Sequence, residues 1–188
     1  ALADYFVGDK LDAINPLVRK RIYYETNHRL FEPMLTRSDR YGWMNTTQPV
    51  NNWNPWIMSN WMAATLLLEK NEQRRADMLH KAMLGVDIYL NGLGKDGGCD
   101  EGPSYWFAAG ASVYDCLELL GRATAGRISI YDEPLIQKMG AYIYKTHIAG
   151  HYFVNFADAD PKLIPDGLML YRFGKALNDP RMIQMGQW

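Results

Sequence analysis

The stretch GPSYWFAAGASVYDCLELL, residues 102–120, decides the fold class because it combines a helix start with a helical apolar stripe. Gly102-Pro103 is a favoured pair for the residue before a helix and its first turn. Small or apolar residues then recur at intervals of three and four, at Trp106, Gly110, Val113, Leu117 and Leu120. This spacing places them on one face of a helix, so the stretch predicts a helix over residues 103–122 with that face buried.

The same kind of helix start recurs along the chain. A small polar residue precedes proline at Asn15-Pro16, Asn54-Pro55, Asp160-Pro161 and Asp179-Pro180, with softer starts at Asn71-Glu72 and before Pro134. These starts and the apolar spacing predict helices over 16–34, 55–70, 72–93, 103–122, 134–148, 161–176 and 180–188. Strand signals are nearly absent, so the sequence predicts an all-α fold.

Short connections between successive helices favour antiparallel neighbours. The starts of alternate helices, at Asn54, Gly102 and Asp160, are therefore expected on one rim of the assembly. We predict antiparallel helix hairpins that form part of an incomplete α/α toroid, with a plain helical bundle as the alternative.

Composition limits the class of protein further. A chain of 188 residues with 48% hydrophobic content predicts one helical domain over residues 1–188. Twenty basic and 21 acidic residues nearly cancel, which argues against a nucleic-acid or membrane-surface partner. The sequence opens at Ala1 and stops at Trp188 inside a predicted helix, so we expect a piece of a longer protein. Cys99 and Cys116 form either a disulfide or two separate thiols.

Two polar, aromatic loops lead into predicted helix starts. The loop from Thr36 to Trp53 contains Trp43, Asn51 and Asn52, and the loop over 94–102 is followed by Tyr105. A helix N-terminus presents unpaired N–H groups and a partial positive charge, which suit a substrate carboxylate. Asparagines at one start and a tyrosine at another therefore suit a uronate site. The alternative is that the asparagines are helix caps and the tyrosine is packing.

The sequence offers little support for metal, redox, hydrolase or nucleotide chemistry. The sequence lacks the short motifs of the commonest zinc, redox, α/β-hydrolase and nucleotide sites. Asp158 and Asp160 are candidates for a cation site or, alternatively, for a helix cap. His28 is a candidate for the cleft or a structural histidine.

Three stretches resemble one family. They are NNWNPW at 51–56, DGGCDEGPSYW at 96–106 and FVNFADAD at 153–160. Together they resemble the heparinase II/III-like polysaccharide lyases over about residues 15–180, and the second stretch is the most distinctive. The resemblance implies an N-terminal incomplete α/α toroid followed by a C-terminal β domain. It also implies β-elimination of an acidic polysaccharide, such as a heparan-type glycan, alginate or a related uronate.

The resemblance also implies roles for particular residues. Asn51, with Asn52 as the adjacent candidate, neutralises the uronate carboxylate, and Tyr105 is the acid and also the base. Glu101 supports the loop. Trp43, Trp53 and Trp106 are candidate stacking platforms for sugar rings or, alternatively, core residues. Candidate activators of the phenol are His28, Arg37 and Arg40. Glu101, His28 and Arg37 are also expected to contact the substrate.

Partners and setting follow from the same resemblance. The family's C-terminal β domain supplies further catalytic residues, so it is an expected partner, and whether this chain acts without it is open. The chemistry requires no metal or organic cofactor, and the expected setting is the bacterial periplasm or the exterior. Two rival readings remain: a non-catalytic glycan-binding fragment, and an α/α-toroid glycoside hydrolase that uses Glu101 and Asp158.

Overall fold

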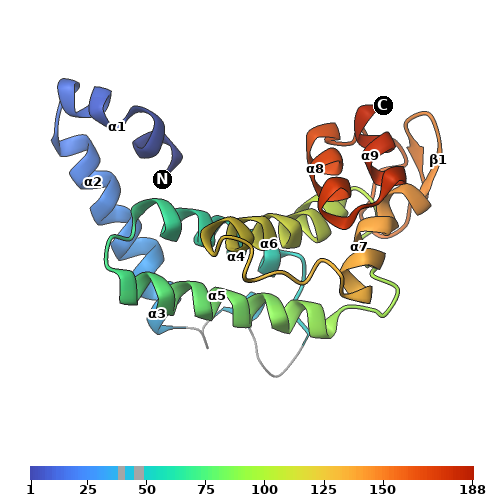
Figure 1. Ribbon diagram of the computed structural model, residues 1–188, viewed down its shortest axis with the longest axis horizontal. Coiled ribbons are helices and arrows are strands. Elements are labelled where there is room, and N and C mark those ends of the chain that lie inside the picture. Colours follow the sequence, from blue (N-terminus) through green and yellow to red (C-terminus); the bar gives the residue numbers. More distant parts are fainter. Residues whose placement is uncertain (38–40, 45–48) are drawn as a thin grey trace. The chain divides into compact units, whose positions relative to one another are not determined.

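The computed structural model describes residues 1–37, 41–44 and 49–188. The fold is all-α, as predicted, and among these residues the strands form one short hairpin (Figure 1). The chain forms two compact units, Ala1–Tyr89 and Leu90–Trp188, where the sequence predicts one domain. Helix α5 (Glu72–Gly92) crosses the boundary between them. The assembly of the hairpins into part of a toroid stays a prediction.

The first unit begins with helix α1 (Leu2–Ile14), which the sequence did not predict. Helix α2 (Leu17–Thr26) continues through a π-helical turn, η1 (Asn27–Phe31), into α3 (Glu32–Thr36). A 3-10 turn, η3 (Gly42–Met44), precedes α4 (Trp53–Leu68). The predicted helix over 16–34 is therefore confirmed as one helical run with a π-helical turn inside it.

Helices α4 and α5 form an antiparallel hairpin, as their short connection predicts. Thr65 contacts Met78, with 3.8 Å between Oγ1 and Sδ. A Cβ on Gly85 would lie 2.6 Å from Cε of Met58, so the glycine lets the helices approach closely. Met58, Met62 and Met78 are buried with Trp61 in the core of this unit.

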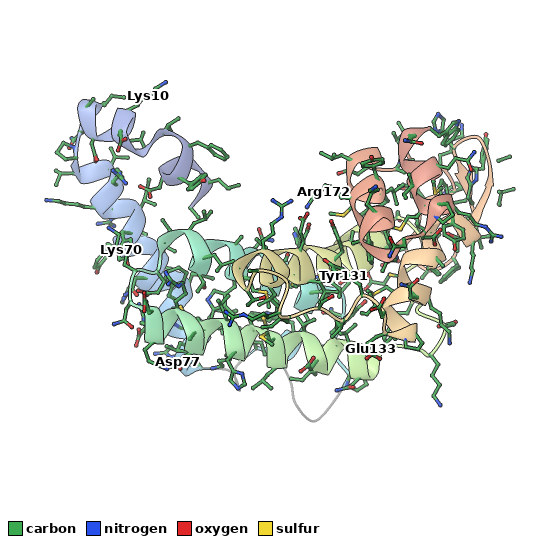
Figure 2. The ribbon with its side chains drawn as sticks, in the orientation of Figure 1. Lys10, Lys70, Asp77, Tyr131, Glu133 and Arg172 are labelled. Atoms are coloured by element: carbon green, nitrogen blue, oxygen red, sulfur yellow. The ribbon has the colours of Figure 1, made fainter. Side chains whose placement is uncertain are left out.

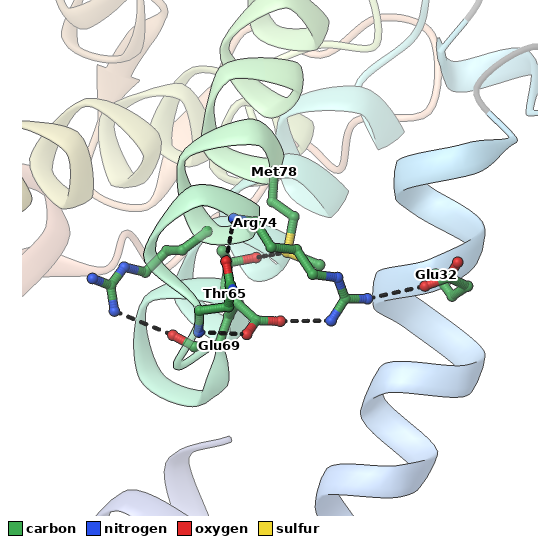
Figure 3. A network of polar contacts seen from close by, with 7 residues as sticks. Glu32, Thr65, Glu69, Arg74 and Met78 are labelled. Atoms are coloured by element: carbon green, nitrogen blue, oxygen red, sulfur yellow. Dashed lines mark hydrogen bonds and ion pairs between the residues drawn. The ribbon is translucent and has the colours of Figure 1, made fainter.

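The turn between α4 and α5 holds a buried carboxylate, Glu69 (Figure 3). Arg74 Nη1 lies 2.6 Å from Glu69 Oε2, and Arg74 Nη2 lies 3.0 Å from Glu32 Oε2. The backbone N–H of Asn71 donates to Glu69 Oε1 at 2.9 Å. Only 3% of the Glu69 side chain is exposed, so Arg74 balances a charge that has left water.

Arg74→Met is expected to lower the free energy of unfolding by about 3 kcal/mol, because it leaves the Glu69 carboxylate buried without its cation. Urea unfolding measures the change. The matched control is Arg29→Met, which removes an exposed ion pair with Glu25 and should cost less than about 0.5 kcal/mol. Equal losses in the two variants would contradict the structural role of Arg74.

The second unit contains the end of α5, a 3-10 turn η4 (Tyr105–Ala108), α6 (Gly110–Ala123) and α7 (Pro134–Lys145). Strands β1 (His147–Ala149) and β2 (Tyr152–Phe153) pair antiparallel, and α8 (Gly167–Leu177) and α9 (Pro180–Gln187) follow. Arg172, which is labelled in Figure 2, lies on α8. Its guanidinium forms an ion pair with Glu118 of α6. Phe173 stacks on Trp106 and Tyr114 in the core.

The helix start predicted at Asp160-Pro161 is wrong. Asp160-Pro161 matches the pattern of a cap, but Pro161 O accepts from Phe153 N at 3.0 Å and Leu163 N donates to His151 O at 2.9 Å. This pairing with the β-hairpin holds the segment out of a helix, and α8 begins later, where the Asp166 side chain accepts from Met169 N at 3.0 Å. The same hairpin ends the predicted helix over 134–148 at Lys145.

Within the described ranges, the helices are all too short or too polar to cross a membrane.

Candidate functional site

Helix α4 begins earlier than predicted, which changes the roles of the asparagines before it. It starts at Trp53, so Asn54 lies inside the first turn and is not the N-cap. Instead, the side-chain oxygen of Asn51 accepts a hydrogen bond from the backbone N–H of Trp53 at 3.2 Å. Asn51 therefore satisfies one of the free donors of the helix start. Its amide nitrogen still carries two N–H donors.

A cavity of about 370 Å³ lies beside this helix start. The described residues that line it are Gly42, Trp43, Pro49, Val50, Asn51 and Trp53. Trp43 stacks on Tyr41, with ring centroids 4.8 Å apart, and Trp53 is 56% exposed. The structure thus brings together three predicted site residues, Trp43, Asn51 and Trp53. Indole faces beside an amide donor suit a sugar ring that carries a carboxylate.

Asn54 positions this cavity, a role that the sequence interpretation missed. Its side chain is fully buried, and its Nδ2 donates to the backbone oxygen of Trp43 at 2.8 Å. This bond ties the turn η3 to helix α4. The available signal was a polar residue inside an aromatic run, between Trp53 and Trp56, but the following proline favoured the interpretation as a cap.

Asn52, the adjacent catalytic candidate, is the N-cap residue of α4 and is buried. Asn51 is exposed and lines the cavity. Because a ligand must reach the amide to bind it, Asn51 is the better placed of the two.

The loop that carries Tyr105 is anchored in the second unit by close backbone approaches. Gly97 has φ +74°, and a Cβ there would lie 2.4 Å from the backbone nitrogen of Met139. Gly102 has φ +91°, and a Cβ there would lie 2.4 Å from Cβ of Ala159. Only glycine meets both the conformation and the space at these positions. The second and third stretches of the resemblance therefore touch at Gly102 and Ala159.

Neighbouring thiols and phenols at this loop are unsuited to act as bases. The Tyr142 hydroxyl donates to the backbone oxygen of Cys99 at 3.2 Å, and burial raises the pKa of Tyr142 to about 12. Burial also raises the pKa of the Cys99 thiol to about 11 and raises that of Cys116. Both cysteines are free thiols, which answers the question that the sequence left open. Tyr105 is exposed.

The sequence predicts that Tyr105 lies in the first turn of an α-helix, and this prediction is wrong. It begins the 3-10 turn η4, and α6 starts only at Gly110. Glu101 is half-buried in the turn before it, which the N–H of Gly102 closes by donating to Cys99 O at 3.0 Å. Glu101 thus lies in the anchored loop that leads to Tyr105.

The prediction that Trp106 is a stacking platform is wrong. Its side chain is 0% exposed, and its indole N–H donates to the backbone oxygen of Met139 at 2.8 Å. A ring enclosed in this way has no face for a sugar. The alternative, that Trp106 belongs to the core, is confirmed.

His28 and Arg37, which are predicted to activate the phenol, belong to the first unit, whereas Tyr105 belongs to the second. His28 is exposed in the turn η1 and stacks on Tyr24 at 5.7 Å, and Arg37 is exposed after α3. Neither His28 nor Arg37 is among the described residues that line the cavity at α4. Arg40 lies outside the described residues.

Asp158 and Asp160 are both exposed, and neither caps a helix, because α8 begins at Gly167. In the part of the chain that the structure describes, no group of three or more His, Cys, Asp or Glu side chains is arranged to hold a metal ion.

The candidate residues therefore fall into two groups. Trp43, Asn51 and Trp53 gather in the first unit, and Glu101 and Tyr105 gather in the second. Each group is built by its own unit. Their joint action on one substrate stays a prediction.

No known protein-family model matches the chain, and no curated protein matches it at a significant level.

Proposed function

We propose that this chain forms part of the catalytic cleft of a polysaccharide lyase that cuts uronate-containing glycans by β-elimination. The observation that carries the proposal is the cavity at the start of α4, which Trp43, Asn51 and Trp53 line together. Indole rings offer an apolar face to the C–H bonds of a sugar, and the amide offers N–H donors to its carboxylate.

Neutralising the carboxylate is the central requirement of this reaction. The proton at C5 of a uronate is barely acidic while the C6 carboxylate carries its full negative charge. The Asn51 amide beside the helix start stabilises the enolate-like charge that develops as this proton leaves. Such donors act most strongly where they are already held in place, as the bond from Trp53 N–H holds the Asn51 side chain.

Tyr105 moves the proton in this proposal. Its phenolate takes H5, the C4–O4 bond breaks, and a C4=C5 double bond forms in conjugation with the carboxylate. The phenol then gives its proton to O4 of the leaving sugar, which regenerates the phenolate. The exposed position of Tyr105 on an anchored loop supports this role, as does the resemblance of residues 96–106 to heparinase II/III-like lyases.

The setting follows from the same resemblance. We propose an acidic polysaccharide as substrate, the β domain of such lyases as a partner, and a periplasmic or secreted location. The chemistry as written needs only side chains of the protein.

The proposal is tested by the ultraviolet absorbance of heparan sulfate, hyaluronan, alginate and polyglucuronate after incubation with the 188-residue chain and with any longer natural form. The conjugated double bond absorbs, so a rise with either form supports elimination. A rise with the longer form alone assigns part of the catalytic set to another domain. Constant absorbance with both forms contradicts the proposal. New reducing ends that appear together with saturated non-reducing ends would then indicate the hydrolase reading with Glu101 and Asp158.

Trp53→Ala is expected to weaken binding of an oligouronate about fivefold, because it removes one indole face of the cavity. Isothermal titration calorimetry measures the dissociation constant. The matched control is Trp56→Ala on the same helix, since Trp53 and Trp56 are 56% and 53% exposed and Trp56 is not among the described lining residues. Equal losses in both variants would contradict the assignment of this cavity to the sugar.

A further inference from the structure

Helix α9 in the second unit presents two faces with different roles. One face packs closely on α8: a Cβ on Gly174 would lie 2.7 Å from the backbone nitrogen of Ile183, and one on Gly186 would lie 2.5 Å from that of Tyr171. The other face carries Arg181, Gln184 and Met185, and Trp188 directly follows the last residue of the helix. Their spacing of three and four residues places them on one side of the helix.

This second face lines a cavity of about 290 Å³ together with Tyr144 of α7 and His147 of β1. The rings of His147 and His151 contact the Trp188 indole with centroids 5.6 and 5.5 Å away. These contacts are tilted, and Trp188 remains 66% exposed. The cavity therefore offers an indole face held by its neighbours.

Polar groups beside the indole have defined partners. The Nε2 of His147 lies 2.8 Å from the backbone oxygen of Gly150. A carbonyl oxygen only accepts, so Nε2 carries a hydrogen. The Tyr144 hydroxyl donates to Asp179 Oδ2 at 3.0 Å. These bonds hold the two rings, which line the cavity together with residues of α9.

Arg181 is the cation of this cavity. Within the described residues Arg181 forms no ion pair. It lies close enough to Tyr144 to affect the pKa of the Tyr144 hydroxyl. Burial and the hydrogen bond to Asp179 raise the pKa of Tyr144, and the charge of Arg181 opposes that rise. A guanidinium presents a planar fork of N–H donors that matches a carboxylate.

We propose that this cavity is a second saccharide site, which takes one uronate unit with its ring on Trp188 and its carboxylate on Arg181. The ligand class rests on the proposed function, whereas the site is built from residues that the proposed elimination does not use. A polysaccharide held at two places dissociates more slowly than one held at a single place. The site would therefore retain a long chain between successive cuts.

The test follows the indole N–H signals of the protein by NMR during titration with cellobiouronic acid, a disaccharide with one uronate. Cellobiose, which lacks only the carboxylate, is the matched neutral ligand. The Trp188 signal is identified by its loss in Trp188→Phe. Arg181→Ala removes the proposed carboxylate partner, and Lys175→Ala removes an exposed positive charge from α8 as its control.

Cellobiouronic acid is expected to shift the Trp188 signal, with a dissociation constant that rises about tenfold in Arg181→Ala and stays unchanged in Lys175→Ala. Cellobiose should bind about tenfold more weakly for the same reason. A Trp188 signal that stays fixed while that of Trp53 moves would overturn the second site and leave the proposed function standing. Equal binding of the two disaccharides would overturn the uronate assignment. A shifted Trp188 signal, combined with constant ultraviolet absorbance of the polyuronates with both forms of the protein, would instead remove the lyase proposal and keep the site.

Discussion

Tyr105→Phe is expected to lower turnover of the susceptible polyuronate at least about a thousandfold, because the variant loses the group that takes H5 and protonates O4. The phenyl ring remains, so packing and glycan binding should stay nearly unchanged. The change should therefore lower kcat and leave the dissociation constant of the substrate in place. The measurement is the rate of ultraviolet absorbance in whichever form of the protein is active.

The matched control for this prediction is Tyr171→Phe. Tyr171 lies on α8 in the same unit and is exposed to the same degree as Tyr105, but the mechanism gives it no role. Its variant should keep full turnover. Unchanged turnover in Tyr105→Phe would remove the phenol from the mechanism.

Asn51→Asp is expected to lower turnover at least about a hundredfold without destabilising the fold. An aspartate keeps the side-chain oxygen that accepts from Trp53 N–H, and a carboxylate is favourable at a helix N-terminus. It loses the amide donors, however, and places a negative charge beside the charge that develops on the substrate. Thermal unfolding tests the role of Asn51 as an acceptor at the helix start, and kcat tests its role as a donor to the substrate. Both are measured on the same preparation.

Asn51→Ala and Asn60→Ala complete this comparison. Asn51→Ala removes both the acceptor for Trp53 N–H and the amide donors, so stability and turnover should both fall. Asn60 is exposed on the same helix, where its Nδ2 donates to Trp56 O at 2.8 Å, and its variant should keep full turnover. Full activity in Asn51→Asp would show that Asn51 is only a helix cap.

The helices that the sequence predicts best are those whose caps are local. Asn71 Oδ1 accepts from Arg74 N at 2.9 Å at the start of α5, and Asp179 Oδ1 accepts from Arg181 N at 2.9 Å at the start of α9. Asp160-Pro161 has the same residue pattern as Asp179-Pro180 but is not a helix start, because the next residues pair with the β-hairpin. Such pairing between separate segments is not visible in the local pattern.

Helix α1 is present in the structure although the sequence pattern does not predict it. Its N-cap is Ala1 without a side-chain hydrogen bond, and Leu2, Phe6 and Ile14 are exposed. It therefore lacks both the start signal and a buried apolar stripe. The ion pairs of Arg19 with Asp4 at 2.7 Å and with Asp12 at 2.6 Å connect it to α2, and such pairs leave little trace in the apolar pattern.

The part of the candidate site that is built from residues close in the sequence can be predicted from the sequence. Trp43, Asn51 and Trp53 lie close in the sequence, so their gathering at one helix start follows from local order. The sequence allows two conflicting roles for Trp106, in the apolar stripe of residues 102–120 and as a sugar platform, and its burial favours the stripe. The role of Asn54 depends on its hydrogen bond to the backbone of Trp43. A polar residue between Trp53 and Trp56 is the signal for it, but the residue pattern does not identify the bonding partner.

The proton NMR spectrum of the oligosaccharides released from a polyuronate tests the central claim most directly. Elimination leaves a C4=C5 double bond at the new non-reducing end, so we predict a vinyl signal from H4 that grows with each cut and is absent with Tyr105→Phe. Released oligosaccharides with saturated ends alone would contradict the lyase assignment.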